Sequence, residues 1–284
     1  MKADFRFLPL KYSWVAIHPQ PIGVVNIIGG AFFGTFPTVF YRYLLQKIFE
    51  KGYTIIALPY RFTFRHWSVA IGLVREQEAL RQAISAEAQR RGYAHHIYEE
   101  DPRSGTRNFF WLGHSLGTKY IALLELLTDL ETKSEQEVLG DCVGLDQYQE
   151  IEKRLQQIDF KNISLLNQPS ILMAPAITGI EAAIPFPALA NLFKRFGIDV
   201  KPSVDQTYCL IRGSRLFSLM GLIAFDGDDT AKPTVSWLRK NLSSKTMPFA
   251  ELPGKHLTPL GYRSGDPILA NRVIEFLQTL AASL

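Results

Sequence analysis

The chain has 284 residues, of which 47% are apolar and 20% are charged, and its formal net charge is +4. This length is enough for one large α/β domain or two small ones with a substantial core. Its basic residues cluster no further than pairs such as Arg90-Arg91, which argues against a track for nucleic acid.

Cysteine usage and the N-terminus bear on the compartment. Cys142 and Cys209 are far apart in the sequence and lack metal-ligand spacing, which disfavours a disulfide framework and a zinc site and suits a reducing compartment. The first residues lack the apolar stretch of a signal peptide, and no stretch reaches the roughly 18 apolar residues that cross a bilayer. We therefore predict a cytoplasmic protein with at most peripheral membrane contact, and the sequence leaves its oligomeric state open.

Short apolar runs alternate with helical patterns along the chain. The first run, residues 23–28, predicts a buried strand, and a helical stripe from Tyr41 to Phe49 follows it and stops at Gly52. A single long helix is expected at 67–91, and a closing helix begins at Asp266-Pro267 and runs to the end. Further strands are predicted at residues 53–58, 108–112, 170–174, 221–225 and around 248–252.

This alternation predicts an α/β fold with a mostly parallel central sheet and helices on both faces. Two stretches interrupt it. Residues 129–168 are charged and helical around 148–158, whereas residues 178–217 are apolar but irregular, as expected of a helical cap insertion. We therefore expect a single domain, 1–284, with the cap inside it.

One motif carries chemistry. The predicted strand that ends at Leu112 is followed by Gly113-His114-Ser115-Leu116-Gly117 and then by an apolar helical pattern. This G-x-S-x-G pattern between a strand and a helix is typical of a nucleophile elbow, in which glycines permit a sharp turn that exposes the serine hydroxyl. The alternative is that Ser115 only caps the helix.

A serine nucleophile needs a base and an orienting acid, here in the chain order serine, acid, histidine. His256 is the only histidine after Ser115, and it follows a predicted strand end in Leu252-Pro253-Gly254-Lys255-His256. For the acid we favour Asp229, four residues beyond the strand end, with Asp228 as the close alternative. The acids at 226, 228 and 229 are also compatible with a solvated turn or a weak divalent-cation site.

The oxyanion of the reaction needs two N–H donors. Leu116, the residue after the serine, supplies one, and Gly30 or Ala31, in the loop after the first strand, supplies the other. That loop could instead be a packed turn or a phosphate loop. Neither G-x-G-x-x-G nor a Walker lysine is present, which disfavours a nucleotide fold.

These segments together resemble the α/β-hydrolase superfamily over nearly the whole chain, on NIIGGAF at 26–32, WLGHSLG at 111–117, LMAPA at 172–176, FDGDDTAKP at 225–233 and LPGKH at 252–256. More narrowly, residues 23–64 resemble an uncharacterised domain family of photosynthetic bacteria and plastids. The resemblance implies Ser115 as nucleophile, His256 as base and Asp229 as acid, with no cofactor or metal. The chain departs from the superfamily pattern at Gly29-Gly30, where many members have His-Gly, and at Asp226, where many have glycine.

The sequence therefore predicts a serine hydrolase that cleaves an ester-type bond, including lipid esters or thioesters, through an acyl-enzyme. Two alternatives stay open: a non-catalytic scaffold with this fold, and an acyltransferase that uses the same serine. A lipid-like acyl substrate is suggested by aromatic residues near the site and in the cap, with Lys194 and Arg195 available for an acidic head group or a membrane surface. The candidate pocket residues are Phe32, His114, Phe186, Phe193 and Phe196.

Overall fold

The computed structural model describes residues 3–105, 108–140, 142–156, 158–159, 163–179, 199–214, 220–242 and 248–282. In these residues eight strands form one sheet in the order β1-β2-β4-β3-β5-β6-β7-β8. All neighbours from β4 to β8 pair in parallel, whereas β1 and β2 form an antiparallel hairpin that joins β4 at one edge. The strands are β1 Leu8–Leu10, β2 Ser13–Ala16, β3 Gly23–Ile28, β4 Tyr53–Ala57, β5 Phe109–His114, β6 Ser170–Met173, β7 Met220–Phe225 and β8 Phe249–Leu252.

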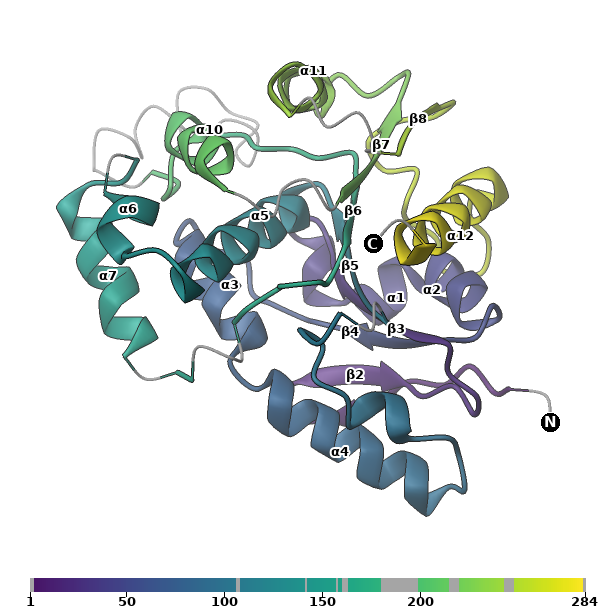
Figure 1. Ribbon diagram of the computed structural model, residues 1–284. Helices are drawn as coiled ribbons and strands as arrows, with labels where there is room; N and C mark the ends of the chain where they lie inside the picture. The colour runs from purple at the N-terminus through teal and green to yellow at the C-terminus, as the bar shows by residue number, and fades with distance from the viewer. Residues whose placement is uncertain are drawn as a thin grey trace.

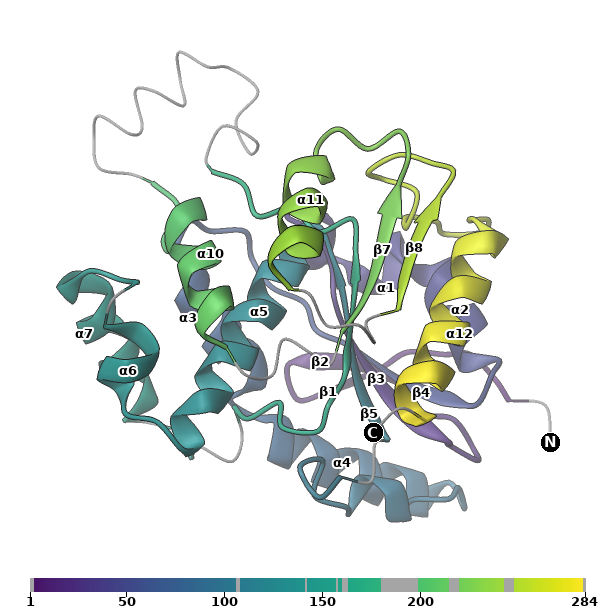
Figure 2. The ribbon, with the colours of Figure 1, turned by 45° about the horizontal axis from the view of Figure 1, so that its top comes forward.

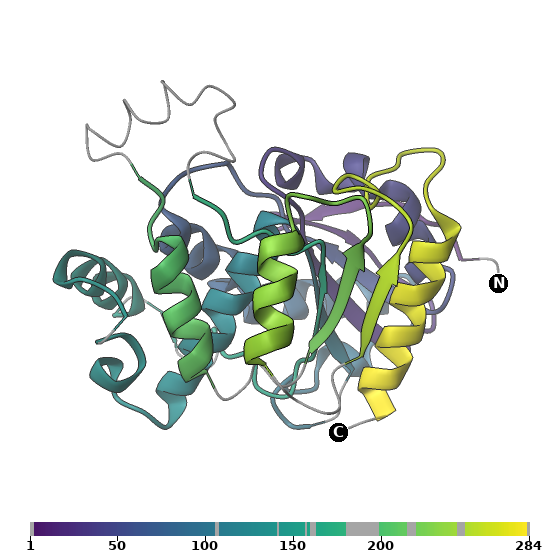
Figure 3. The ribbon, with the colours of Figure 1, turned by 90° about the horizontal axis from the view of Figure 1, so that it is seen from above.

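Helices cover both faces of this sheet (Figure 1). One face carries α1, α2 and α12, and the other carries α3 and α5, with α10 packed against α5. Farther along the sheet, α11 and α12 flank β7 and β8 from opposite sides (Figures 2 and 3). The helices are η1 Phe33–Thr35, α1 Pro37–Phe40, α2 Arg42–Phe49, α3 His66–Val74, α4 Gln77–Arg90, η2 His96–Tyr98, α5 Leu116–Thr128, η3 Asp129–Glu131, α6 Glu135–Leu139, α7 Leu145–Leu155, α10 Val204–Gly213, α11 Lys232–Asn241 and α12 Pro267–Ala282.

The predicted α/β class with a mostly parallel sheet is confirmed, and all six predicted strands are present as β3 to β8. Five of these strands, β3 to β7, are buried along their whole length, as expected when helices cover both faces. The hairpin of β1 and β2 is absent from the sequence prediction, because its two short strands have mixed burial and show neither a continuous apolar run nor a regular alternation.

The predicted long helix at 67–91 is wrong in one respect. It is two helices, α3 and α4, separated at Arg75 and Glu76. The two helices pack on different partners: α3 lies against α5 and α7, whereas α4 lies against the edge strand β1. One straight helix could not reach both sets of neighbours.

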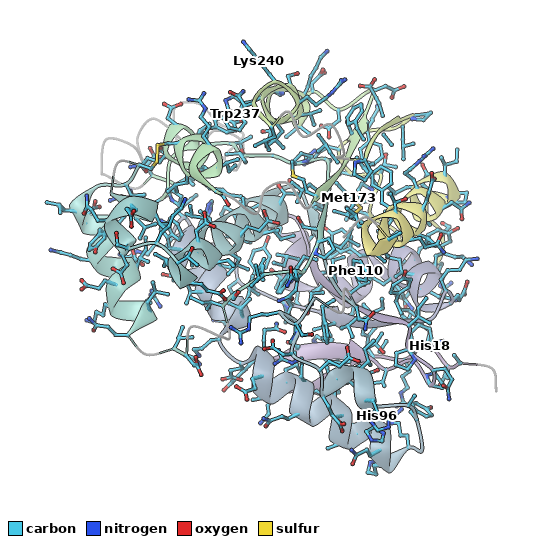
Figure 4. All side chains as sticks on the ribbon, viewed as in Figure 1. His18, His96, Phe110, Met173, Trp237 and Lys240 are labelled. Atoms are coloured by element: carbon cyan, nitrogen blue, oxygen red, sulfur yellow. A yellow bond between two sulfur atoms is a disulfide. The ribbon has the colours of Figure 1, made fainter. Side chains whose placement is uncertain are left out.

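The expectation of unpaired cysteines is also wrong. Cys142, just after α6, forms a disulfide with Cys209 of α10, with a Cα–Cα distance of 5.6 Å (Figure 4). The two residues are 67 positions apart, so their spacing does not indicate the pairing. The argument for a reducing compartment therefore loses its basis. Among the described helices, none has the length and apolar content needed to span a bilayer.

Candidate active site

The site is organised by the turn between β5 and α5. Ser115 occupies this turn with φ 53° and ψ −119°, a conformation that L-residues rarely adopt. Close packing requires glycine at 117 and favours it at 113. A Cβ atom at Gly117 would lie 2.1 Å from the Ile28 carbonyl oxygen, and one at Gly113 would lie 3.1 Å from the backbone N and Cα atoms of Thr118. The tight turn places the serine hydroxyl at the carboxyl edge of the sheet, at the amino end of α5.

Ser115 and His256 meet although they are 141 residues apart in the chain. The Oγ atom of Ser115 lies 2.8 Å from Nε2 of His256, and Nδ1 of His256 lies 2.8 Å from Oδ2 of Asp228. Because a carboxylate accepts the Nδ1 proton, Nε2 is left as the acceptor for the serine hydroxyl. The three side chains thus form one hydrogen-bonded chain that could carry a proton away from Ser115.

The acid in contact with the imidazole is Asp228, and the preference for Asp229 is corrected. Asp228 is buried, and its second oxygen accepts hydrogen bonds from the backbone N–H groups of Thr230 and Ala231, both at 3.0 Å. Asp229 is exposed to solvent. Counting residues from the strand end could not separate two adjacent carboxylates, because the turn into α11 decides which of them faces inward.

The loop after β8 holds His256 in place. Gly254 has φ 145°, and its N–H donates to Oδ1 of Asp226 at 3.0 Å while its carbonyl accepts from Gly227. Two carboxylates of the 226–229 segment therefore make different contacts. Asp226 fixes the histidine loop and Asp228 contacts the histidine ring.

A second histidine, His114, connects this loop to the strand edge. The Gly30 N–H donates to the Tyr41 hydroxyl at 2.7 Å, and that hydroxyl lies 2.8 Å from Nδ1 of His114. The Nε2 atom of His114 lies 2.9 Å from the backbone carbonyl of His256. Since a carbonyl only accepts, Nε2 carries the proton, and Nδ1 accepts from Tyr41. Burial lowers the pKa of His114 to about 3, so the ring remains neutral at working pH.

This network changes the expectation for the oxyanion donors. The N–H of Gly30 is already used by Tyr41, so Gly30 is not a free donor. Within the described part of the chain, the N–H groups of Leu116 and Ala31 donate to no protein acceptor. Of the three residues predicted as oxyanion donors, Leu116 and Ala31 therefore remain. Glycine at position 29 lets the Tyr41 ring approach this loop, because a Cβ atom at Gly29 would lie 2.7 Å from the Tyr41 ring.

A cavity of about 240 Å³ opens onto Ser115 and His256. Its walls are mainly aromatic and aliphatic. Phe32 and His114, both predicted as pocket residues, line it, whereas Phe186, Phe193 and Phe196 lie outside the described residues. The cavity is lined by Ala31, Phe32, Phe33, Phe62, His66, His114, Ser115, Leu116, Ala176, Thr178, Gly179, Val200, Thr230, His256 and Leu257.

Two members of the site have no signal in the sequence. Tyr41 fits the apolar stripe of its helix, and His66 stands at a helix start, so neither residue is distinguished by its local pattern. His66 is 2% exposed and lies in the cavity wall. Both residues come from elements far from the elbow in sequence, and a single sequence does not reveal such a contact.

One group of side chains in the described residues has the spacing of a metal site. Ligand atoms of His95, His96 and Glu99 lie within 4.8 Å of one another. His96 is 84% exposed and lies at the outer edge of the molecule, away from Met173, whose carbonyl accepts the Ser115 N–H (Figure 4). This group therefore lies apart from the hydrogen-bonded side chains of Ser115, His256 and Asp228.

Comparison with known proteins supports the fold. Residues 7–139 match the model of a family described as a protein of unknown function, DUF1350. A candidate carboxylesterase from Lactobacillus plantarum has a TM-score of 0.55 at 11% identity, covering 98% of this chain and 99% of its own. Esterase B from Lactobacillus rhamnosis, in a phosphonate-inhibited structure, has a TM-score of 0.50 at 13% identity, covering 95% and 80%. No functionally curated protein matches the sequence.

At these identities the structural likeness establishes the architecture and leaves the chemistry to the residues themselves. The strand order, the helices on both faces and the turn after β5 are all accounted for by one architecture. The chain has the α/β-hydrolase fold, and its residues 7–139 match the DUF1350 family.

Proposed function

We propose that this protein is a serine hydrolase that cleaves carboxylic ester bonds, with Ser115 as nucleophile, His256 as base and Asp228 as the orienting acid. The observation that carries the proposal is the continuous chain of two 2.8 Å contacts from the Ser115 hydroxyl to the Asp228 carboxylate. Serine is a weak nucleophile at neutral pH, and a histidine in this position is what activates it.

The reaction would proceed in two steps. The Oγ atom of Ser115 attacks the ester carbonyl carbon while its proton passes to Nε2 of His256, and the N–H groups of Leu116 and Ala31 stabilise the oxyanion. The imidazolium then protonates the departing alkoxide, which leaves an acyl-serine. In the second step, water attacks the acyl carbon while its proton passes to Nε2 of His256, and the imidazolium then returns this proton to Oγ as the bond between Oγ and the acyl carbon breaks, which releases the acid and the free serine. Asp228 keeps the ring in the required tautomer and stabilises its positive charge.

The test is the substitution Ser115→Ala, assayed with p-nitrophenyl esters from acetate to decanoate. We expect at least a ~10³-fold loss of kcat/KM for the best ester, because the nucleophile is removed while the fold is kept. A fluorophosphonate probe should label the wild type and fail to label the variant. The matched control is Ser236→Ala, on the exposed side of α11, which should behave like the wild type in both assays.

Each outcome decides between functions. Absence of both turnover and labelling in the wild type would support the scaffold alternative. Labelling that persists in Ser115→Ala would place the reactive serine elsewhere. Ester cleavage that is accelerated by an added alcohol, with formation of a new ester, would indicate acyl transfer in place of hydrolysis.

A further inference from the structure

The wall of the Ser115 cavity contains a buried imidazole that the proposed reaction does not use. His66, the first residue of α3, is 2% exposed and lines the cavity together with Ser115 and His256. Neither Nδ1 nor Nε2 of His66 has a hydrogen bond of good geometry with a described residue, although the Thr63 backbone is close enough to the ring to act on its charge. A buried polar side chain without partners is uncommon in native proteins, because each unsatisfied group weakens the fold.

The ring is held firmly in spite of its unpaired nitrogens. The His66 backbone N–H donates to the Lys201 carbonyl at 2.9 Å. The imidazole packs edge-on against Tyr120, with ring centroids 5.4 Å apart and planes at 88°. The position of this hydrogen-bonding group is therefore fixed before any ligand arrives, so the side chain loses little entropy on binding.

The surroundings of His66 define the kind of group that it can bind. Burial and the nearby Lys119 lower the pKa of His66 well below its usual value, against a smaller opposing effect of the Thr63 backbone. The ring is therefore neutral and offers one N–H donor and one nitrogen acceptor. A neutral imidazole suits an uncharged oxygen, such as a hydroxyl or a ketone, better than a carboxylate or a phosphate.

The rest of the cavity limits the size and polarity of the ligand. Most of its lining residues are apolar, with Phe33, Phe62 and Val200 among them. Its volume of about 240 Å³ is below the ~300–1,000 Å³ of most small-molecule pockets. The ligand that fits is a short hydrocarbon chain with one polar substituent.

We propose that the Ser115 pocket takes esters of short acids that carry a hydroxyl or ketone oxygen on the chain, and that His66 binds this oxygen. The idea rests on the proposed function, since that function supplies the ester at Ser115. A polar pocket group discriminates strongly against a ligand that lacks its partner, because the buried group then remains unpaired. His66 would thus be a specificity residue.

Binding is measured in the Ser115→Ala variant, in which the bound ester is not cleaved. The probes are methyl 4-oxopentanoate and methyl pentanoate, which differ in one ketone oxygen. We expect the keto ester to bind at least ~10-fold more tightly by calorimetric titration, which corresponds to about one hydrogen bond at 1.4 kcal/mol per factor of ten. It should also shift the imidazole ¹⁵N resonances of His66 in a ring-labelled sample, whereas the plain ester should not.

The variant His66→Phe in the same background should reduce the preference for the keto ester to less than twofold. Its melting temperature should rise by roughly 2–4 °C, because an apolar ring replaces two unsatisfied nitrogens. The matched control is His96→Phe, at an exposed residue of η2 that lies away from Met173 in Figure 4, and this variant should keep the full preference.

Equal binding of the two esters to Ser115→Ala, or a preference that survives His66→Phe, would overturn the proposal. The ring resonances test the same contact without any substitution at His66, and His66 signals that do not move with the keto ester would also contradict it. Neither readout depends on turnover, so a failure here leaves the serine hydrolase proposal intact. Conversely, a labelling assay that contradicts the serine hydrolase proposal would not change the measured preference for the keto ester.

Discussion

Two sets of buried polar groups along α5 differ in their hydrogen bonding. At the amino end, Ser115 and the side chains around it form a closed hydrogen-bond network in which every polar side-chain atom of Asp228 and His114 has a partner. Farther along the helix, the Tyr120 hydroxyl and Oε2 of Glu125 are buried without a partner among the described residues. His66, which packs on Tyr120, shares this condition.

The difference shows that burial alone does not mark a functional group. At the amino end, the network fixes tautomers and ring positions, which is what proton transfer requires. Along the rest of the helix, unpaired groups lower stability unless a ligand or a proton satisfies them. The network therefore predicts large losses of activity on substitution, and the unpaired groups predict gains in stability.

The largest effect is expected at the acid. Asp228→Asn should lower kcat by ~10³–10⁴-fold, since an amide no longer holds His256 in the tautomer that accepts the serine proton. The adjacent Asp229→Asn should change kcat by less than twofold, because Asp229 is exposed and does not contact the ring. Steady-state kinetics with the best p-nitrophenyl ester measure both, and the reverse ranking would restore Asp229 as the acid.

The next effect concerns the disulfide, which ties α10, a helix packed against α5, to the segment after α6. Replacing both cysteines, as Cys142→Ser with Cys209→Ser, should lower the free energy of unfolding by ~2–4 kcal/mol, because the closed loop restricts the unfolded chain. Urea denaturation measures this loss. The value of kcat/KM should stay within threefold of the wild-type value. A large loss of activity would show that the position of α10 affects the hydrogen-bond network around Ser115.

A smaller effect is expected at His114, which we regard as a positioning residue. His114→Phe breaks the link between Tyr41 and the His256 carbonyl. We expect a loss of ~10–100-fold in kcat and a smaller change in KM, because the substitution displaces the base. Partial recovery of kcat in His114→Gln would show that the hydrogen bonds matter, whereas equal losses in both variants would indicate a packing role only.

Local patterns in the sequence are enough to predict much of this architecture. The buried strands β3 to β7 are continuous apolar runs, and the elbow at Ser115 lies between two glycines within five residues. Chain order then selects His256 without any geometry. These features are predictable because each one depends on residues that are neighbours in sequence or on a simple count.

The features that the sequence does not reveal depend on contacts between distant residues. Asp228 and Asp229 differ only in which one the turn into α11 buries, and Gly30 loses its predicted role because Tyr41 reaches its N–H. The pairing of Cys142 with Cys209 likewise follows from how α6 and α10 pack. A single sequence carries no information on such packing, so the argument from cysteine spacing against a disulfide fails.

The last prediction concerns Glu125, one of the unpaired groups, and the pH dependence of the free energy of unfolding. Burial raises the pKa of Glu125 to about 8, with the Ser170 hydroxyl bond opposing the shift. The folded state therefore binds a proton that the unfolded state releases above pH ~4.5, and this contribution to stability declines as the pH rises from 4.5 through 8. Glu125→Gln cannot ionise, so its free energy of unfolding should exceed that of the wild type at pH 8 and be nearly equal to it at pH 4.5.

Urea unfolding of both proteins at the two pH values measures this difference. Lys119 works in the opposite direction, because burial lowers its pKa to about 7 and stability then increases as the pH rises from there toward 10.5. Both proteins contain Lys119, so its effect cancels in the difference between them. A gain in the free energy of unfolding that is the same at pH 4.5 and pH 8 would mean that Glu125 does not hold its proton in the folded state. The unpaired Glu125 would then not differ electrostatically from the hydrogen-bonded groups at the amino end of α5.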